Sequence, residues 1–545
     1  MFYIVDLDNE MSVLVVVVWR MTYEQPAIHQ RHANSLFEDE RDAPGLCHEH
    51  LSFPDLLPAT PEPLVVVDVL SGAPGCGKSE KMLVEAANTP GHYLFAFLTT
   101  ELADEQAQRF AILAPKATLS VIHSKRGRGA VGSRLTQART GSENQNHSVV
   151  FVTHEALVTN DLGQFQGWHL RIDECPNVTG SGHLKLAHSV AHYKSAFNLE
   201  PVEAGWSLVR TAGPGASWKE IANDTMGVTI RDFHAWADRP ADLLLNLDSF
   251  TGPEIRKRVP WVAIWQLGQV AVFSSVTIAA SNFIGSITHR VWASLYGARV
   301  EFRENRLGLA QTAQPKISIG YFTAAHEGTT VFWKGEGHAC IVKVEEWLKH
   351  NRPDLGYWSS NDAIEHDFLD RIKGKAEKPK LAGLNRLRDE TSCAMIYSSK
   401  AVQGDEPIIA MFDIGKKEVQ ASREDEDIFQ FVCRGAIRDP NYGGQYDAYV
   451  YSRSQAERLA TKLTDAGYYD VTCTGIASAG IMSVQRLPPG GRAPGDDPAT
   501  KAALAKQQSA RRSKLYRLRK KAQRTGASSA GEIISTGPFS SSPVT

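Results

Sequence analysis

The stretch SGAPGCGKSE, residues 71–80, contains a complete match to the phosphate-binding pattern G-x-x-x-x-G-K-[ST]. Glycines in such a loop let backbone N–H groups converge on phosphates, because a Cβ would intrude. We expect Lys78 to reach the β- and γ-phosphates of a nucleotide and the Ser79 hydroxyl to ligate Mg²⁺. The residues expected to bind the nucleotide here are Gly72, Gly75, Gly77, Lys78 and Ser79.

The residues around this loop predict a strand before it and a helix after it. PLVVVDVL precedes the loop as a short apolar run, and KSEKMLVEAANT follows with helical spacing. Further strands are predicted at 92–100, 148–154, 168–174 and 270–280, and ELADEQAQRFAIL predicts a helix. Strands that alternate with helices are typical of a parallel α/β sheet.

A second α/β region is predicted between about residues 315 and 480. The runs predicted as strands are KISIGYF, TTVFW, CAMIYSS, EPIIAMF and YDAYVYS. The runs predicted as helices are HACIVKVEEWLKH, DEDIFQFVCRGAIR and SQAERLATKLTDAG.

Two adjacent acids, Asp173 and Glu174, follow the predicted strand WHLRIDE. An aspartate at the end of a strand is directed toward the crevice where the phosphates bind, and it holds Mg²⁺ there, commonly through water. The neighbouring glutamate is placed to orient or deprotonate an attacking water. The pair therefore favours nucleotide hydrolysis over transfer to a metabolite.

At these residues the chain resembles the superfamily 2 helicases, the DEAD-like group, whose second motif begins Asp-Glu. LTTELADEQ resembles the family's motif Ia and VTHEAL its Thr-His element, both of which contact the nucleic-acid strand. SSVT resembles motif III, which couples the ATP site to the strand, and AGLN resembles motif V. The residues that this resemblance implies in strand contact or coupling are Thr99, Thr100, Thr153, His154, Ser275, Thr277, Gly383 and Asn385.

QFVCRGAIR resembles motif VI, with Cys433 where the family commonly has glycine. Gln430, Arg434 and Arg438 are four residues apart, so on one helix they share a face. The resemblance implies that Gln430 binds the nucleotide and that the two arginines act catalytically. An arginine from a second domain neutralises the charge that develops on the γ-phosphate.

The resemblance implies an α/β fold, a P-loop NTPase with two tandem RecA-like parallel-sheet domains. We expect an N-terminal extension at 1–62, partly disordered, and a first domain at 63–312 with an insertion or helical subdomain at about 180–262. The second domain is expected at 313–485, followed by a linker and a largely disordered basic tail at 486–545. We expect both termini to be flexible.

Charge and cysteine usage restrict the function further. The net charge of −2 excludes a polyanion binder by bulk charge, so a nucleic-acid surface must be local. Eight Lys or Arg residues within 511–524 predict either a phosphate-contacting arm or a solvated tail. The seven cysteines form no C-x-x-C pair, which indicates neither a zinc site nor a disulfide framework. LCHEHL and ITHR are interpreted as surface histidines.

No apolar run is long enough to span a bilayer, so no membrane partner is expected. SVLVVVVWR near the N-terminus is interpreted as a strand or an unstructured leader, and a reducing cytoplasm is the simplest setting.

We therefore predict a nucleic-acid-dependent ATPase that uses ATP and Mg²⁺ to translocate on or unwind DNA. RNA is the other possible strand. The context suggested is replication or repair of a mobile element or phage, with replication proteins as possible partners. Two alternatives stay open: a viral DNA-packaging motor, and a nucleic-acid-binding ATP clamp that does not unwind. A packaging motor would carry a nuclease domain with clustered acids after its ATPase.

Overall fold

The structure is a computed structural model, and the residues that it describes belong to one unit of the chain, Leu51–Thr545. The described residues are 64–127, 129–184, 197–202, 205–211, 231–246, 258–380 and 386–486. Gly383 and Asn385 lie outside them, as do the predicted N-terminal extension and the basic run 511–524.

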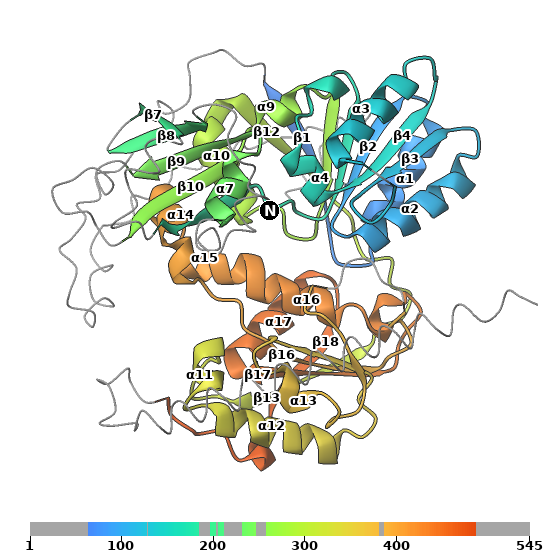
Figure 1. Cartoon of the computed structure of the whole chain (residues 1–545). Coiled ribbons are helices and arrows are strands. Elements are labelled where there is room, and N and C mark those ends of the chain that lie inside the picture. The colour runs from blue at the N-terminus through green and yellow to red at the C-terminus, as the bar shows by residue number, and fades with distance from the viewer. Residues whose placement is uncertain are drawn as a thin grey trace, which may run out of the picture. The chain divides into compact units, whose positions relative to one another are not determined.

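The first domain is built on a seven-stranded parallel sheet (Figure 1). Its order is β12-β1-β11-β5-β2-β4-β3. The strands are β1 (Val65–Ser71), β2 (His92–Phe97), β3 (Thr118–Ile122), β4 (Ser148–Thr153), β5 (His169–Asp173), β11 (Ser275–Ala279) and β12 (Val300–Arg306). The helices are α1 (Lys78–Asn88), α2 (Thr100–Leu113), α3 (Val131–Gly141), α4 (His154–Thr159), α9 (Gly268–Ala271) and α10 (Ile287–Tyr296).

The register of this sheet aligns the ends of the strands that carry the predicted motifs. Ala279 of β11 lies opposite Asp173 of β5, and Phe97 of β2 lies opposite Thr153 of β4. Because all these strands run parallel, their carboxyl ends form one edge, which is also the edge at which β1 enters the phosphate loop.

The buried faces of the sheet explain why the strands are almost continuously apolar. Parallel strands covered by helices on both faces need apolar residues at successive positions. Phe95 and Phe151, from neighbouring strands, stack with their ring centroids 5.3 Å apart, and Phe110 of α2 packs edge-on against Phe151. This aromatic cluster fixes α2 on one face of the sheet.

The less regular stretch after β5 forms a separate antiparallel sheet with the order β6-β10-β9-β8-β7. Its elements are β6 (Thr179–Leu184), β7 (Phe197–Pro201), β8 (Trp206–Thr211), α7 (Arg231–Ala237), β9 (Ala241–Asn246) and β10 (Val259–Trp265). A Cβ added to Gly180 would lie 2.1 Å from Nε1 of Trp236, so the indole requires glycine there. The described part of this region is thus mainly a sheet rather than a helical subdomain.

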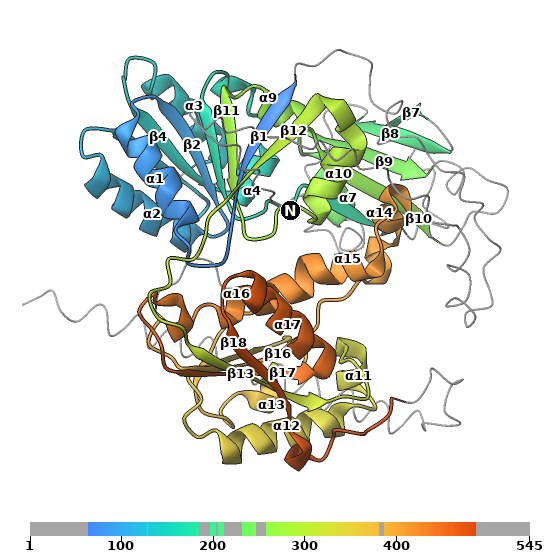
Figure 2. The ribbon, with the colours of Figure 1, turned by 180° about the vertical axis from the view of Figure 1, so that it is seen from behind.

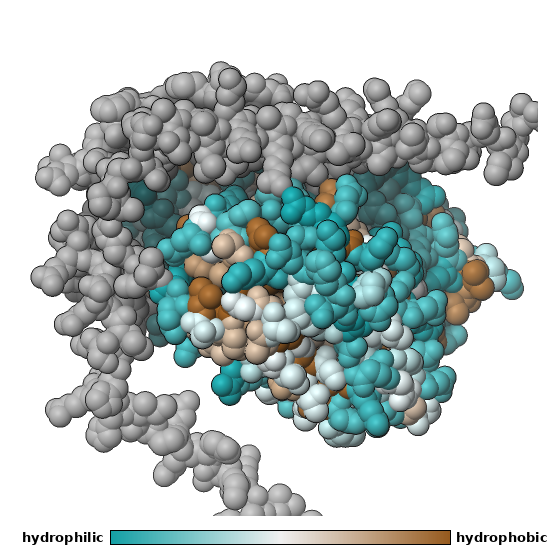
Figure 3. All heavy atoms as spheres, turned by 90° about the horizontal axis from the view of Figure 1, so that it is seen from below, coloured by the Kyte–Doolittle hydropathy of each residue, from teal (hydrophilic) through white to brown (hydrophobic). Residues whose placement is uncertain are grey.

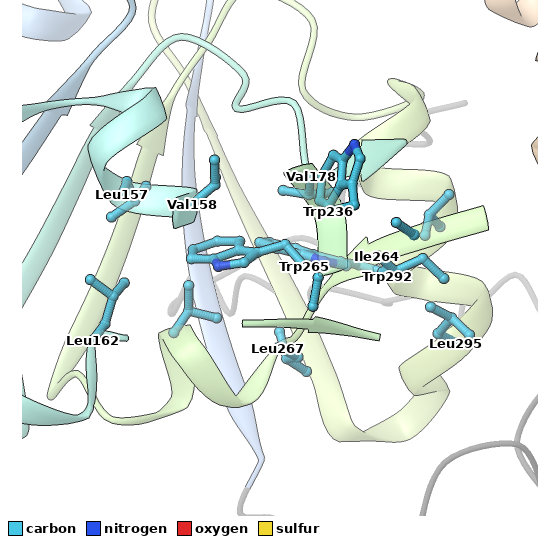
Figure 4. Packing of buried hydrophobic residues seen from close by; sticks show 14 of the residues in the cluster. Leu157, Val158, Leu162, Val178, Trp236, Ile264, Trp265, Leu267, Trp292 and Leu295 are labelled. Atoms are coloured by element: carbon cyan, nitrogen blue, oxygen red, sulfur yellow. The ribbon is translucent and has the colours of Figure 1, made fainter. Parts of the chain in front are cut away.

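Trp265, at the end of β10, packs where the antiparallel sheet meets the first domain (Figure 4). Its ring stacks on Trp292 of α10 with centroids 6.1 Å apart, and both side chains are fully buried. Leu157 and Val158 of α4 belong to the same apolar cluster. The insertion is therefore joined to the first domain by a continuous core.

The second domain is built on a six-stranded parallel sheet with the order β15-β14-β16-β17-β13-β18 (Figure 2). Its strands are β13 (Lys316–Thr323), β14 (Tyr357–Ser360), β15 (Lys375–Ala376), β16 (Ser392–Ile396), β17 (Gln445–Ser452) and β18 (Asp470–Gly475). Its α-helices are α11 (Thr330–Lys334), α12 (His338–Asn351), α13 (Glu365–Phe368), α14 (Glu406–Phe412), α15 (Lys416–Gln420), α16 (Glu426–Val432) and α17 (Arg453–Asp465). The described residues thus fold as two tandem RecA-like domains of the P-loop NTPase class, which confirms the predicted fold class.

Short helices of other types connect these elements. The 3-10 helices are Gly163–Phe165, Gly297–Arg299, Gln403–Asp405, Ala436–Arg438 and Ala477–Ala479, and a π-helical turn spans Ala421–Asp425.

Three element predictions were wrong. TTVFW forms α11, which begins where the Thr329 hydroxyl accepts a hydrogen bond from the Phe332 N–H. EPIIAMF forms α14, because Pro407 stands in the first turn, where its missing N–H costs nothing. The helix predicted to run through Arg438 ends at Val432. Short apolar runs do not separate strands from helices by pattern alone.

A segment of the second domain packs into the core of the first. Ile408 and Met411 of α14 and Val419 of α15 are buried in the same cluster as the residues of β10 and α10. The Ser181 hydroxyl of β6 donates a 2.7 Å hydrogen bond to the carbonyl of Gly404 just before α14. From α15 the chain continues through the π-helical turn directly into α16.

The described surface of the second domain seen in Figure 3 is mostly hydrophilic, with apolar side chains scattered among polar ones. Among the described residues there is no helix with the length and apolar character needed to cross a membrane.

Candidate active site

The phosphate loop connects β1 to α1 through three glycines with positive φ. Gly72 has φ +142°, and a Cβ there would lie 2.5 Å from the carbonyl oxygen of Leu307. Gly77, with φ +88°, precedes the first residue of α1. Lys78 is buried, and its ammonium donates to the carbonyls of Gly72 at 2.7 Å and Ala73 at 3.0 Å. The Lys78 side chain therefore folds back over the phosphate loop and lies where we expect it to contact the phosphates.

Ser79 and Asp173 lie together at the carboxyl edge of the sheet. The Ser79 hydroxyl donates a 2.5 Å hydrogen bond to Oδ1 of Asp173. Burial, followed by the charge of the neighbouring Glu174, raises the pKa of Asp173 to about 7. A hydroxyl and a carboxylate are oxygen ligands that suit Mg²⁺, and a cation would relieve the cost of burying this carboxylate. The two side chains fit the metal site predicted for them.

Glu174 follows β5 in a left-handed backbone conformation, with φ +71°. Its N–H donates to the carbonyl of Ala279 at 2.8 Å, which holds the residue at the sheet edge beside β11. Its Oε2 accepts a 2.9 Å hydrogen bond from the side-chain amide of Gln430 in α16. This bond joins the predicted base of the first domain to the second domain.

Gln430 lies at the centre of a polar cluster between the domains. Its amide also lies 3.1 Å from Oε1 of Glu426 and 3.4 Å from Oγ of Ser281, and the Ser281 hydroxyl donates to Glu426. Sequence reasoning missed Ser281 and Glu426. The available signal for Ser281 was its place two residues after β11, next to the strand that ends in Asp173.

Arg434 and Arg438 lie near the phosphate loop, although they do not share a helix. Arg434 is 5% exposed, and its Nη2 donates to Oε1 of Gln430 at 3.3 Å. Its Nε is buried and has no hydrogen-bond partner among the described residues. Cγ of Arg438, at the end of a 3-10 helix, lies 3.0 Å from where a Cβ on Gly75 would be. Burial and then the charge of Arg434 lower the pKa of Arg438 to about 10.

One buried and one half-buried cation, side by side beside a Gly-rich loop, indicate an anion site. Like charges in low dielectric repel, and a phosphate between them would offset that repulsion. The break in the helix at Cys433 is what lets both guanidinium groups approach the loop. The sequence spacing suggested one helix face, whereas the structure uses a helix end and a short 3-10 turn.

His154, Thr153 and Thr99 lie at the same sheet edge, where they have structural partners. The buried His154 ring donates from Nε2 to the Asp173 carbonyl at 2.9 Å, and burial lowers its pKa to about 4. The hydroxyls of Thr99 and Thr153 cap the next helices by accepting from Leu102 N–H and Ala156 N–H. Thr100, the first residue of α2, is half-buried.

Ser275 and Thr277 are not brought together with the phosphate loop and Asp173, and their coupling role stays a prediction. Ser275 is the first residue of β11, so it lies at the amino edge of the sheet, where it bonds to His169 and Arg171. Thr277 is buried within the strand opposite Arg171. SSVT resembles motif III in sequence, but the residue of β11 that lies opposite Asp173 is Ala279 at the carboxyl end of the strand.

A cavity of about 480 Å³ opens beside Ala73 of the phosphate loop. It is lined by Arg306 at the end of β12, by the following connection that includes Gln311, and by Asp465 and Tyr469 of the second domain. Tyr469 is 77% exposed. Sequence reasoning named no residue for the nucleotide base, and this cavity supplies an aromatic ring and an arginine for stacking.

A second cavity, of about 700 Å³, lies beside Glu174. Glu174, Ser281 and Gln430 line it together with β6 and residues of both domains. Besides Glu174, its charged lining residues are Glu155, Arg239, Lys380, Asp405, Arg423, Glu426 and Asp427.

No protein-family model matches this sequence, and no curated protein matches it either. Solved structures do match. The apo structure of XPD is 11% identical with a TM-score of 0.43, over 76% of this chain and 97% of that one. Xpd4 of S. tokodaii is 9% identical with a TM-score of 0.40, over 75% and 96%. Dbp5 of S. cerevisiae bound to RNA and ADP BeF3 is 8% identical with a TM-score of 0.31, over 76% and 86%.

Proposed function

We propose that this chain is a nucleic-acid-dependent ATPase that translocates on or unwinds DNA by the chemistry of superfamily 2 helicases. The observation that carries the proposal is the convergence of Arg434, Arg438 and Gln430 from the second domain on the phosphate loop and Glu174 of the first. A nucleotide bound there would touch both domains, so its hydrolysis would change the contact between them.

The residues of the loop and sheet edge would bind Mg-ATP. The Lys78 ammonium would leave the carbonyls of Gly72 and Ala73 for the β- and γ-phosphates, and the base would stack near Tyr469. Ser79 and Asp173 would hold Mg²⁺, and the ion would supply positive charge that offsets part of the charge of the phosphates.

Glu174 would orient and deprotonate the attacking water. In the structure the Glu174 carboxylate accepts a hydrogen bond from the side-chain amide of Gln430, which fixes the orientation of the carboxylate at the sheet edge. Arg434 and Arg438 would then neutralise the charge that develops on the γ-phosphate, because Arg438 lies against Gly75 of the loop and Arg434 bonds to Gln430 beside Glu174.

Movement would follow through α16. Gln430 and Glu426 contact the first domain near Glu174 and Ser281, and the helical run from α15 leads back to the insertion. Loss of the γ-phosphate would release the contacts of Arg434 and Arg438 beyond the α16 end of this helical run. At the α15 end, α14 would stay packed in the core of the first domain. The two domains could then alternate between two arrangements.

The strand would be DNA, with RNA as the alternative, and Thr99, Thr100 and Thr153 are the proposed contacts at the sheet edge. Gly383 and Asn385 remain proposed contacts outside the described residues. Replication proteins and a mobile element or phage are the proposed context. The second parallel sheet with arginines near the phosphate loop favours this class over a packaging motor or a clamp.

The test is phosphate release by the full chain with ATP and Mg²⁺, alone and with single-stranded DNA or RNA. A strand that raises the rate at least about tenfold supports the proposal, and no stimulation by either strand contradicts it. Strand displacement from a tailed duplex, measured in parallel, separates unwinding from translocation alone.

A further inference from the structure

Two histidines and an aspartate meet in the second domain, away from the candidate active site. His338 begins α12, and His366 and Asp367 lie in α13, which packs against α12 (Figure 1). The sequence separates His338 from the other two residues by 28 positions or more, so no spacing pattern predicted the cluster.

The three side chains present one donor atom each to a common point. One ligand atom from each residue lies within 4.8 Å of the others. Nε2 of His338 lies 3.1 Å from Oδ1 of Asp367, and Nε2 of His366 lies 3.4 Å from Oδ2. Small side-chain movements would bring all three donors to about 2.0–2.2 Å from one ion.

Asp367 is the most constrained member of the cluster. The residue is 1% exposed, and its Oδ2 is buried without a hydrogen bond among the described residues, although Nε2 of His366 is close. A buried carboxylate oxygen without a donor is costly, and a cation is the partner that would satisfy it. Arg371, four residues on, pairs with Glu345 instead.

We propose that His338, His366 and Asp367 bind a divalent transition-metal cation of the Zn²⁺ class. Two imidazoles and a carboxylate suit this class, whereas Mg²⁺ and Ca²⁺ take oxygen ligands. The side chain of His338 is 44% exposed, which leaves one side of the site open to a water as the fourth ligand. The absence of cysteine pairs in the sequence argued against zinc, but this site uses none.

The ion would tie the first turn of α12 to α13. α13 spans only Glu365–Phe368, too short to be stable alone, so a cross-link at its centre would fix its position. The site stands apart from ATP hydrolysis, since none of its residues lines either cavity of the candidate active site.

The test is the zinc content of the full chain, stripped with EDTA, reloaded with Zn²⁺ and desalted. Wild type is compared with His338→Ala and His366→Ala, whose side chains are partly exposed and whose loss leaves the core intact. We expect each variant to lose about one equivalent of zinc and to bind Zn²⁺ at least about 100-fold more weakly.

His350→Ala is the matched control, because His350 is an exposed histidine at the other end of α12. It should keep the wild-type zinc content, and Zn²⁺ should raise the melting temperature of wild type and of this control but not of the two site variants. Equal zinc content in wild type and either site variant would overturn the proposal. Loading with Co²⁺ gives a second readout. The visible absorption spectrum of the Co²⁺-loaded protein should differ between the wild type and both site variants.

Discussion

Replacing Arg434 with alanine should slow ATP turnover far more than it weakens nucleotide binding. The guanidinium is 5% exposed, and its Nε has no acceptor among the described residues, so a developing phosphate charge would meet a donor that is already desolvated. Arginines in this role contribute about 10³- to 10⁵-fold to kcat. We expect a loss of about 10³-fold for Arg434→Ala, which corresponds to about 4 kcal/mol of transition-state stabilisation.

Arg438→Ala should have a smaller effect, of about 10- to 100-fold, because Arg438 is less buried than Arg434. The assay is strand-stimulated phosphate release at saturating ATP, combined with titration of a fluorescent nucleotide to separate binding from turnover. Arg453→Ala is the control, since Arg453 is an exposed arginine of the same domain that pairs with Glu457.

If Arg434→Ala and Arg438→Ala both kept turnover within about threefold of the control, neither guanidinium would act on the phosphate. The assignment of the second domain to the hydrolysis step would then be refuted. A loss of nucleotide affinity with unchanged turnover at saturation would also refute it, because it would place the arginines in ground-state binding.

Three further predictions follow from particular side chains. Glu424 is fully buried and accepts four hydrogen bonds, so Glu424→Ala should lower the free energy of unfolding, measured by urea denaturation, by about 3–5 kcal/mol. Glu457→Ala is the control, and because Glu457 is exposed it should change this free energy by less than about 1 kcal/mol. Burial would raise the pKa of Glu327, but hydrogen bonds from Lys400 and neighbouring donors lower it to about 2, below its ordinary 4.5. The stabilisation from Glu327 is therefore complete above pH 4.5 and lost as the pH falls toward 2, and the acid limb of a thermal-denaturation series should flatten in Glu327→Gln. Cys76 lies in the phosphate loop, partly exposed, so a thiol reagent should inhibit ATP turnover and Cys76→Ala should remove the inhibition. Inhibition that persists in Cys76→Ala would contradict this prediction and assign the effect to another cysteine.

Local patterns predicted the parts of the site that lie within one strand–loop–helix unit. The phosphate loop needs glycines at fixed positions and a strand before it, and these features are contiguous in sequence. Asp173 and Glu174 were predicted for the same reason, since they stand at the end of the strand that carries them. These predictions rest on spacing that neighbouring residues alone determine.

Gln430, Arg434 and Arg438 were named only through the family resemblance, and other residues whose contacts come from distant segments were not predicted. The Ser-Val-Thr pattern lies at the amino end of β11, away from Asp173, because the strand begins at Ser275. Ser281 acquires its contacts from Glu426, 145 residues away. EPIIAMF became a helix because Pro407 and packing against the insertion outweighed its apolar run.

Phosphate release by Glu174→Gln with saturating single-stranded DNA tests the central claim most directly. The substitution keeps the size of the side chain and removes the base, so turnover should fall by about 10²- to 10⁴-fold while ATP affinity stays within about threefold of wild type. Unchanged turnover in Glu174→Gln would contradict the account, because the carboxylate at the edge of the first sheet would then have no part in hydrolysis.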